Sequence, residues 1–261
     1  MISSTDIGVA LKDAGVVEGG VVFCHSNLAF FGQVKNCSNS NELADIFLSA
    51  FMDVLGPTGA LIVPAFTYSF GSEKFEKVFD PSLPAKGMST IANRLIERGV
   101  GIRSLDPMLS VVGFGEKAYR IVKNVGNICY GPNSIWERLF EEDALICNLN
   151  FDSGSTFLHW VEREIGVTYR TDFELSGTIL INEENIEKKM VYTGRHLDDM
   201  SATPSFQSFH TMCLREGITK KINLGRGQIC SHSCGDVSRF LKKTIKVFPF
   251  ILTQGNRYSI D

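Results

Sequence analysis

The feature that most constrains the fold is a regular alternation of apolar, β-rich runs with segments of helical periodicity. The apolar runs lie at 20–26, 60–69, 109–115 and 144–149, and the helical patterns at 41–55, at 89–98, from 134 and at 156–165. Such alternation is typical of an α/β fold in which helices cover the faces of a sheet. We therefore predict an α/β protein.

The pattern changes after about Tyr169, where two short strand-like runs replace the strand–helix alternation. These runs, at 177–182 and 188–194, are separated by the charged stretch 183–187, which we predict to be the turn of an antiparallel hairpin. The sequence shows no repeat, low-complexity tract or long linker. We expect a single domain over 1–261, with a core at about 1–170 and an α+β elaboration at about 171–261.

Charge and composition exclude several partners. The formal net charge is −3, with no basic surplus to neutralise a phosphate backbone, so nucleic acid is not an expected partner. Every apolar run is interrupted well before the roughly 20 residues that a membrane helix needs. The N-terminal segment has neither a basic region nor a continuous apolar core typical of a signal peptide. Seven irregularly spaced cysteines suit reduced thiols, so we expect a cytoplasmic protein.

Polar side chains gather where the apolar run at 144–149 ends. Asn148 and Asn150 lie there, and the following helical segment carries His159 and Glu162. Three residues apart on a helix, His159 and Glu162 share a face, so the carboxylate can orient the imidazole of a general base. A hydrogen-bonded core histidine remains the alternative. Residues 152–156 are equally consistent with the N-terminal capping of a helix.

Three other sequence patterns offer weaker evidence for other kinds of site: a metal site, a phosphate-binding loop and a cysteine nucleophile. Cys230, His232 and Cys234 alternate as on one strand face but have no fourth ligand nearby in sequence, so we expect no metal site. The stretch 224–228 lacks the Lys-Ser/Thr of a phosphate loop and is predicted to be a hairpin turn, although Arg226 remains a candidate for contact with a cofactor phosphate. No cysteine stands in a nucleophile motif.

Five blocks, in order along the chain, resemble the aminoglycoside 3-N-acetyltransferase family. They are HSNLAFFG (25–32), ELADIFLSAFMDVLGPTGALIVPAFTYS (42–69), IRSLDPMLSVVGFG (102–115), GPNSIWERLFEEDALI (131–146) and STFLHWVE (155–162). The resemblance runs from about residue 20 to 170 and weakens afterwards. It implies a three-layer α/β/α sheet unlike the GNAT acetyltransferases, with the α+β elaboration following it.

The resemblance also implies acetyl-CoA, or another acyl-CoA, as co-substrate, and direct transfer of the acyl group with His159 as base and Glu162 supporting it. The loops implied to bind the cofactor contain His25, Ser26, Thr67, Ser104 and Ser110. The positions assigned to the substrate are Tyr68, Asp106, Asn150 and Asp152. Asp106 stands where many antibiotic-modifying members carry a histidine before proline, which puts the acceptor identity in doubt.

We therefore expect an N-acyltransferase that acts on an amino sugar. The sequence at 157–170 resembles relatives associated with surface-polysaccharide biosynthesis, which suggests an amino sugar linked to a nucleotide. An aminoglycoside 3-N-acetyltransferase that confers antibiotic resistance is the first alternative, and a non-catalytic ligand-binding relative is the second. Residues 195–210 are a candidate part of the acceptor pocket. The small-molecule acceptor, the acyl group and a homodimeric assembly stay open.

Overall fold

The computed structural model describes residues 1–71 and 76–256. Its main sheet contains β1 (Val21–Ser26), β2 (Ala60–Pro64), β4 (Ile102–Arg103), β5 (Val111–Phe114), β6 (Leu145–Leu149), β9 (Lys220–Leu224) and β10 (Gly227–Ser233). The strand order is β4-β5-β2-β1-β6-β10-β9. The central strand β1 pairs in parallel with β2 and β6, whereas the outer pairs are antiparallel. The carboxyl ends of β1, β2 and β6 therefore meet at one edge of the sheet.

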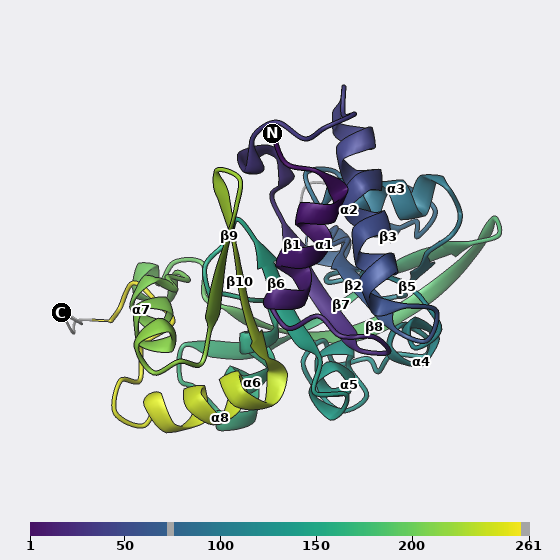
Figure 1. Ribbon diagram of the computed structural model, residues 1–261. Helices are drawn as coiled ribbons and strands as arrows, with labels where there is room; N and C mark the ends of the chain where they lie inside the picture. The colour runs from purple at the N-terminus through teal and green to yellow at the C-terminus, as the bar shows by residue number, and fades with distance from the viewer. Residues whose placement is uncertain (72–75, 257–261) are drawn as a thin grey trace.

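Helices cover both faces of this sheet (Figure 1). One face packs against α1 (Ser4–Asp13), α2 (Ser40–Leu55) and α3 (Thr90–Glu97), and the other against α4 (Ala118–Val122), α5 (Ile135–Glu141), α6 (Phe157–Ile165) and α8 (Cys234–Thr244). Alternate side chains of β1 supply the two cores: Phe23 lies in one and Cys24 in the other. The predicted α/β class with helices on both faces is confirmed.

A second sheet consists of β3 (Val78–Phe79), β7 (Arg170–Ile181) and β8 (Glu184–Arg195). The β7–β8 hairpin extends away from the body of the molecule (Figure 1). Its turn is only Asn182–Glu183, both with positive φ, and Ile181 pairs directly with Glu184. The predicted turn at 183–187 was therefore too long, because the charged residues after Glu183 lie on an exposed strand that needs no apolar alternation.

The chain after β8 returns to the main sheet. Helix α7 (Gln207–Arg215) precedes β9, and the β9–β10 turn at Gly225 and Arg226 confirms the predicted hairpin. Strand β10 pairs with β6, so residues beyond 170 complete the same sheet. Cys234 begins α8 rather than continuing β10. The prediction that Cys230, His232 and Cys234 share one face of a strand was therefore wrong.

The described residues contain neither a cluster of metal ligands nor a helix that could span a membrane. In residues 1–71 and 76–256, no three Cys, His, Asp or Glu side chains gather as metal ligands. Over the same residues, none of the helices has the length and apolar character needed to cross a bilayer.

Candidate active site

The site lies where β1 and β6 end, beside the start of α6. The loop between β6 and α6 is fixed by Asn148, whose Nδ2 donates to the carbonyl oxygens of Asp152 and Gly154 at 2.6 and 2.8 Å. The Asp152 carboxylate accepts from the Gly154 amide at 2.7 Å. These bonds satisfy the backbone of a tight loop and so fix where α6 begins.

The centre of the site is the pair His159 and Glu162 on α6. His159 Nδ1 lies 2.6 Å from Glu162 Oε2, and the Glu162 side chain is only 1% exposed. Tyr169 donates its hydroxyl to Glu162 Oε1 at 2.7 Å, and Arg170 Nε donates to Oε2 at 2.5 Å. A buried carboxylate with three donors is ionised and oriented, so it holds the imidazole with Nδ1–H towards Glu162 and Nε2 free to accept a proton.

The environment keeps His159 neutral. Burial is the main cause that lowers its pKa, and the nearby Arg170 guanidinium lowers it further, against the opposing effect of Glu162. Burial raises the pKa of Glu162, but its partners His159, Arg170 and Tyr169 outweigh this, and the net pKa lies below its usual value. A neutral imidazole beside an ionised carboxylate is the protonation state that a general base requires.

A second histidine, His25, ends β1 close to the start of α6. Its Nε2 lies 3.3 Å from Ser155 Oγ and 3.5 Å from the Thr156 amide nitrogen. Burial is the main cause that lowers the pKa of His25 to about 4, and the proximity of His159, a second group that can be protonated, lowers it further. A neutral His25 thus connects the β1 end to the N-terminus of the helix that carries His159.

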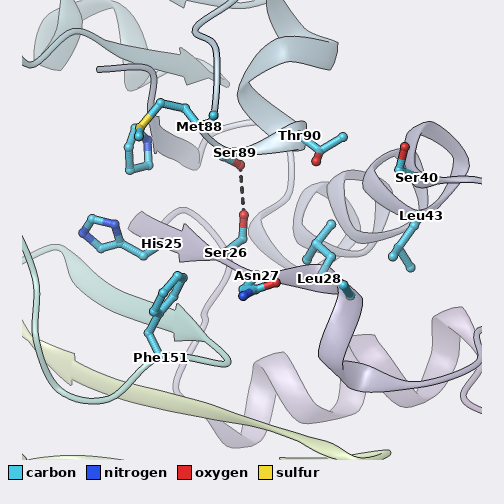
Figure 2. Close-up of a pocket in the computed structure, with 13 residues that line it drawn as sticks. His25, Ser26, Asn27, Leu28, Ser40, Leu43, Met88, Ser89, Thr90 and Phe151 are labelled. Carbon is cyan, nitrogen blue, oxygen red and sulfur yellow. Dashed lines mark hydrogen bonds between the residues drawn. The ribbon is translucent and has the colours of Figure 1, made fainter. Parts of the chain in front are cut away.

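A cavity of about 420 Å³ extends from His25 along the sheet edge. Figure 2 shows His25 and Phe151 at one end and Ser40 and Leu43 at the other. Between them Ser26 and Ser89 share a hydrogen bond of 2.9 Å. The cavity thus reaches the first residues of both α2 and α3 and joins polar groups with apolar walls.

Of the five predicted cofactor-binding positions, the structure brings only His25 and Ser26 to this cavity. Thr67 donates its hydroxyl to the Pro107 carbonyl oxygen at 3.0 Å. Ser104 and Ser110 are fully buried: Ser104 Oγ accepts from the Val111 amide, and Ser110 Oγ donates to the Ala65 carbonyl oxygen. Ser104 and Ser110 are therefore used inside the protein and form no part of the site that we propose.

Asp106 also has an internal role in the structure. Its Oδ1 accepts from the amides of Met108 and Leu109 at 2.8 and 2.9 Å, Cys129 lies against Oδ2, and the residue is 6% exposed. Burial is the main cause that raises its pKa. This geometry is that of a turn cap, and it does not support the predicted contact with substrate.

We expect Asp106→Ala to lower the free energy of unfolding by roughly 1–3 kcal/mol, because two buried amides lose their acceptor. Urea unfolding of wild type, Asp106→Ala and Asp106→Asn measures this, and the asparagine variant should lose less because its Oδ1 still accepts. A normal stability in Asp106→Ala combined with a raised KM for the acceptor would instead return Asp106 to the substrate site.

The remaining predicted substrate residues differ in their surroundings. Asn150 has a positive φ of 61° and bridges two segments: its Nδ2 donates to the Asn27 carbonyl oxygen and its Oδ1 accepts from the Gln228 amide. Asp152 is half-buried in the β6–α6 loop. Tyr68 is 46% exposed and stays a candidate for acceptor contact.

Sequence reasoning missed several residues that surround His159. Arg170 and Tyr169 contact Glu162, the Tyr130 ring stands edge-on to His159 with centroids 5.9 Å apart, and the Phe206 ring lies 6.2 Å away. Phe206 belongs to the 195–210 stretch predicted to contribute to the acceptor pocket. Ser89 was treated only as the start of a helix, and its place in the cavity follows from tertiary packing.

An oriented neutral imidazole, and a cavity that begins at His25 where the parallel strands end, are features that a general-base site of an α/β enzyme requires. The family model described as aminoglycoside 3-N-acetyltransferase matches residues 23–246. The chain belongs to the aminoglycoside 3-N-acetyltransferase family. It is therefore an acyl-CoA-dependent N-acyltransferase, and its family uses acetyl-CoA, which confirms the predicted enzyme class and co-substrate.

Solved structures share the fold at low identity. Aminoglycoside acetyltransferase AAC(3)-Xa superposes with a TM-score of 0.79 at 20% identity, covering 94% of this chain and 93% of that one. AAC-IIIb in a binary complex with CoASH gives 0.77 at 16% identity (94% and 96% covered), and YokD from Bacillus subtilis gives 0.74 at 18% (93% and 98%). No curated protein sequence matches the chain.

Proposed function

We propose that this enzyme transfers the acetyl group of acetyl-CoA directly to an amino group of an amino sugar, with His159 Nε2 as the general base. The observation that carries the proposal is the 2.6 Å contact between His159 Nδ1 and the buried Glu162 carboxylate. It directs the other ring nitrogen away from Glu162 as a proton acceptor. A bound amine next to a thioester gains from proximity, so no covalent enzyme intermediate is needed.

The cavity that begins at His25 suits the pantetheine arm and phosphates of acetyl-CoA. Leu28, Leu43 and Met88 offer apolar contact, whereas Ser26 and Asn27 offer polar groups. Ser89 precedes α3, but its side chain does not cap the helix and instead bonds Ser26. The first-turn amides of α3 are therefore without a side-chain acceptor from their N-cap, and such amides favour an anion.

The surroundings of His159 favour an acceptor with few positive charges. The charged groups placed against it by the described contacts are Glu162 and Arg170, which neutralise one another. Tyr130 and Phe206 provide aromatic walls, and the buried Asp106 is already bonded to two amides. Because a polycationic aminoglycoside binds best among several carboxylates, these residues support an amino sugar with a single amino group, including one linked to a nucleotide.

The test is thiol release from acetyl-CoA with a panel of nucleotide-linked amino sugars and aminoglycosides, and with product mass as the second readout. We expect an acetylated amino sugar and a weaker response to aminoglycosides. Preferred turnover of an aminoglycoside would overturn the acceptor assignment, and binding of CoA without transfer to any acceptor would favour a non-catalytic relative.

The mostly buried free cysteines suit a reducing compartment, so we propose a cytoplasmic location.

A charge placed in the cavity tests where CoA binds. We expect Ser89→Asp to raise the KM for acetyl-CoA about tenfold or more, since a carboxylate at the start of α3 repels phosphate, and a tenfold change corresponds to about 1.4 kcal/mol. The matched control is Ser89→Asn, which has nearly the same shape without the charge. Equal KM values for the two variants in steady-state assays would place the phosphates elsewhere.

A further inference from the structure

Arg170, the first residue of β7, lies against the catalytic histidine although it belongs to a different element. Its Nη2 lies 2.6 Å from His159 Nδ1 and 3.2 Å from His159 Nε2, while its Nε donates to Glu162 Oε2. The Arg170 side chain is 6% exposed. A cation this close to both ring nitrogens cannot lie along the lone pair of either one, so it lies over the imidazole ring. The lone pair of Nε2 is left for the acceptor amine.

We propose that Arg170 is a positioning residue that holds His159 in its neutral, Nδ1-protonated form and makes the imidazolium, once formed, a strong proton donor. The proposal rests on the proposed function, because it assigns Arg170 a part in the same reaction. Its geometric basis is the two-point contact in which one guanidinium bonds the carboxylate that orients the ring and also lies over that ring.

The other titratable groups around His159 do not duplicate this charge. They are Glu162 on α6, Tyr169 before β7, His25 on β1 and Tyr130 before α5. Glu162 stabilises the imidazolium, whereas the tyrosines are neutral and His25 is held neutral by burial. Arg170 therefore supplies the one fixed positive charge that these described contacts bring to the ring, and it opposes Glu162 directly.

The charge matters at two stages of transfer. The amine nitrogen forms a bond to the acetyl carbon, the carbon–sulfur bond breaks, and the amine proton passes to His159 Nε2. That proton then passes from Nε2 to the departing CoA thiolate, which restores the neutral ring. Glu162 favours the protonated imidazole, which could not accept a proton, and Arg170 opposes that effect in addition to burial. Arg170 keeps the ring neutral beforehand and promotes the return of the proton afterwards.

The test is a histidine NMR titration of the whole protein, which needs no acceptor and so separates this proposal from the proposed function. The chain has five histidines, and His159→Gln identifies the resonance of interest. In wild type, we expect His159 to titrate below the ordinary value of about 6.5, and in Arg170→Gln at least about one pH unit higher than in wild type. Arg170→Lys, which keeps a charge, should lie between the two.

Two outcomes would overturn the proposal: a wild-type His159 that titrates at or above its ordinary value, or an Arg170→Gln value equal to that of wild type. The first needs only the native protein, so the test survives if Arg170→Gln fails to fold. Arg163→Gln is the matched control, because Arg163 extends from the same region to Thr193 and Asp172 and does not contact His159. Once an acceptor is known, the acid limb of kcat/KM should move upward in Arg170→Gln only.

Discussion

Replacing His159 with alanine should lower kcat/KM for acetyl transfer by about 10²–10⁴-fold, the usual contribution of a positioned general base. The amine must lose a proton as it attacks the thioester, and His159 has the free ring nitrogen oriented for that step. Steady-state thiol release with the best acceptor of the panel measures the change. His159→Gln should fall as far as His159→Ala, because an amide can fill the space but cannot take the proton.

Binding of acetyl-CoA provides the control for this loss. His159 is not among the residues that line the cavity, so both variants should bind acetyl-CoA within a few-fold of wild type, measured by calorimetry. His25→Gln, at the end of the cavity, should change the KM for acetyl-CoA instead. A His159→Ala enzyme that keeps a tenth or more of the wild-type rate would assign the base to another residue.

Glu162→Ala should have the largest effect on stability, lowering the free energy of unfolding by about 3–5 kcal/mol, as when one partner of a buried ion pair is removed. The substitution leaves the 6% exposed Arg170 side chain without its carboxylate and the Tyr169 hydroxyl without its acceptor. Urea unfolding at pH 7 measures the loss. The matched control is Asp172→Ala. The Asp172 side chain is 47% exposed and pairs with Arg163, so this substitution should lower the free energy of unfolding by at most about 1 kcal/mol.

The same carboxylate predicts how the loss depends on pH. The pKa of Glu162 is lowered in the folded state, so its contribution is fully present above the unfolded value of about 4.3 and disappears as pH falls through the lower folded value. The stability difference between wild type and Glu162→Ala should therefore shrink below about pH 4. A difference that stays constant into that range would mean that Glu162 stabilises the fold through packing alone.

Local spacing was enough to predict that the side chains of His159 and Glu162 lie together. His159 and Glu162 are three residues apart on one helix, and helical geometry alone brings their side chains together. The parallel strands could also be predicted from the sequence, because buried strands such as β1 and β6 are continuous apolar runs. The hairpin was predicted from the sequence, but its two strands were predicted too short. Its outer half is exposed on both faces and lacks the apolar–polar alternation that identifies a strand.

Residues that join the site from other elements could not be predicted in this way. Arg170 reaches Glu162 only because β7 turns back beside α6, and spacing across a loop does not fix that return. The opposite difficulty applies to Ser104, Ser110 and Asp106, whose predicted ligand contacts the structure does not support. Polar residues at strand ends look alike in sequence whether they face a cavity or satisfy buried backbone groups, and in the structure these three side chains bond to backbone groups.

The central claim is direct transfer of the acetyl group to an amine with His159 as base, and a single-turnover experiment tests it most directly. Enzyme in excess over acetyl-CoA is mixed with the best acceptor, quenched at intervals, and analysed by mass spectrometry for acetylated acceptor and acetylated protein. We predict that wild type forms acetylated acceptor with no acetyl-protein at any time, and that His159→Gln forms it at least about a hundredfold more slowly. An acetylated protein that appears and decays as product forms, or a His159→Gln rate equal to wild type, would contradict the account.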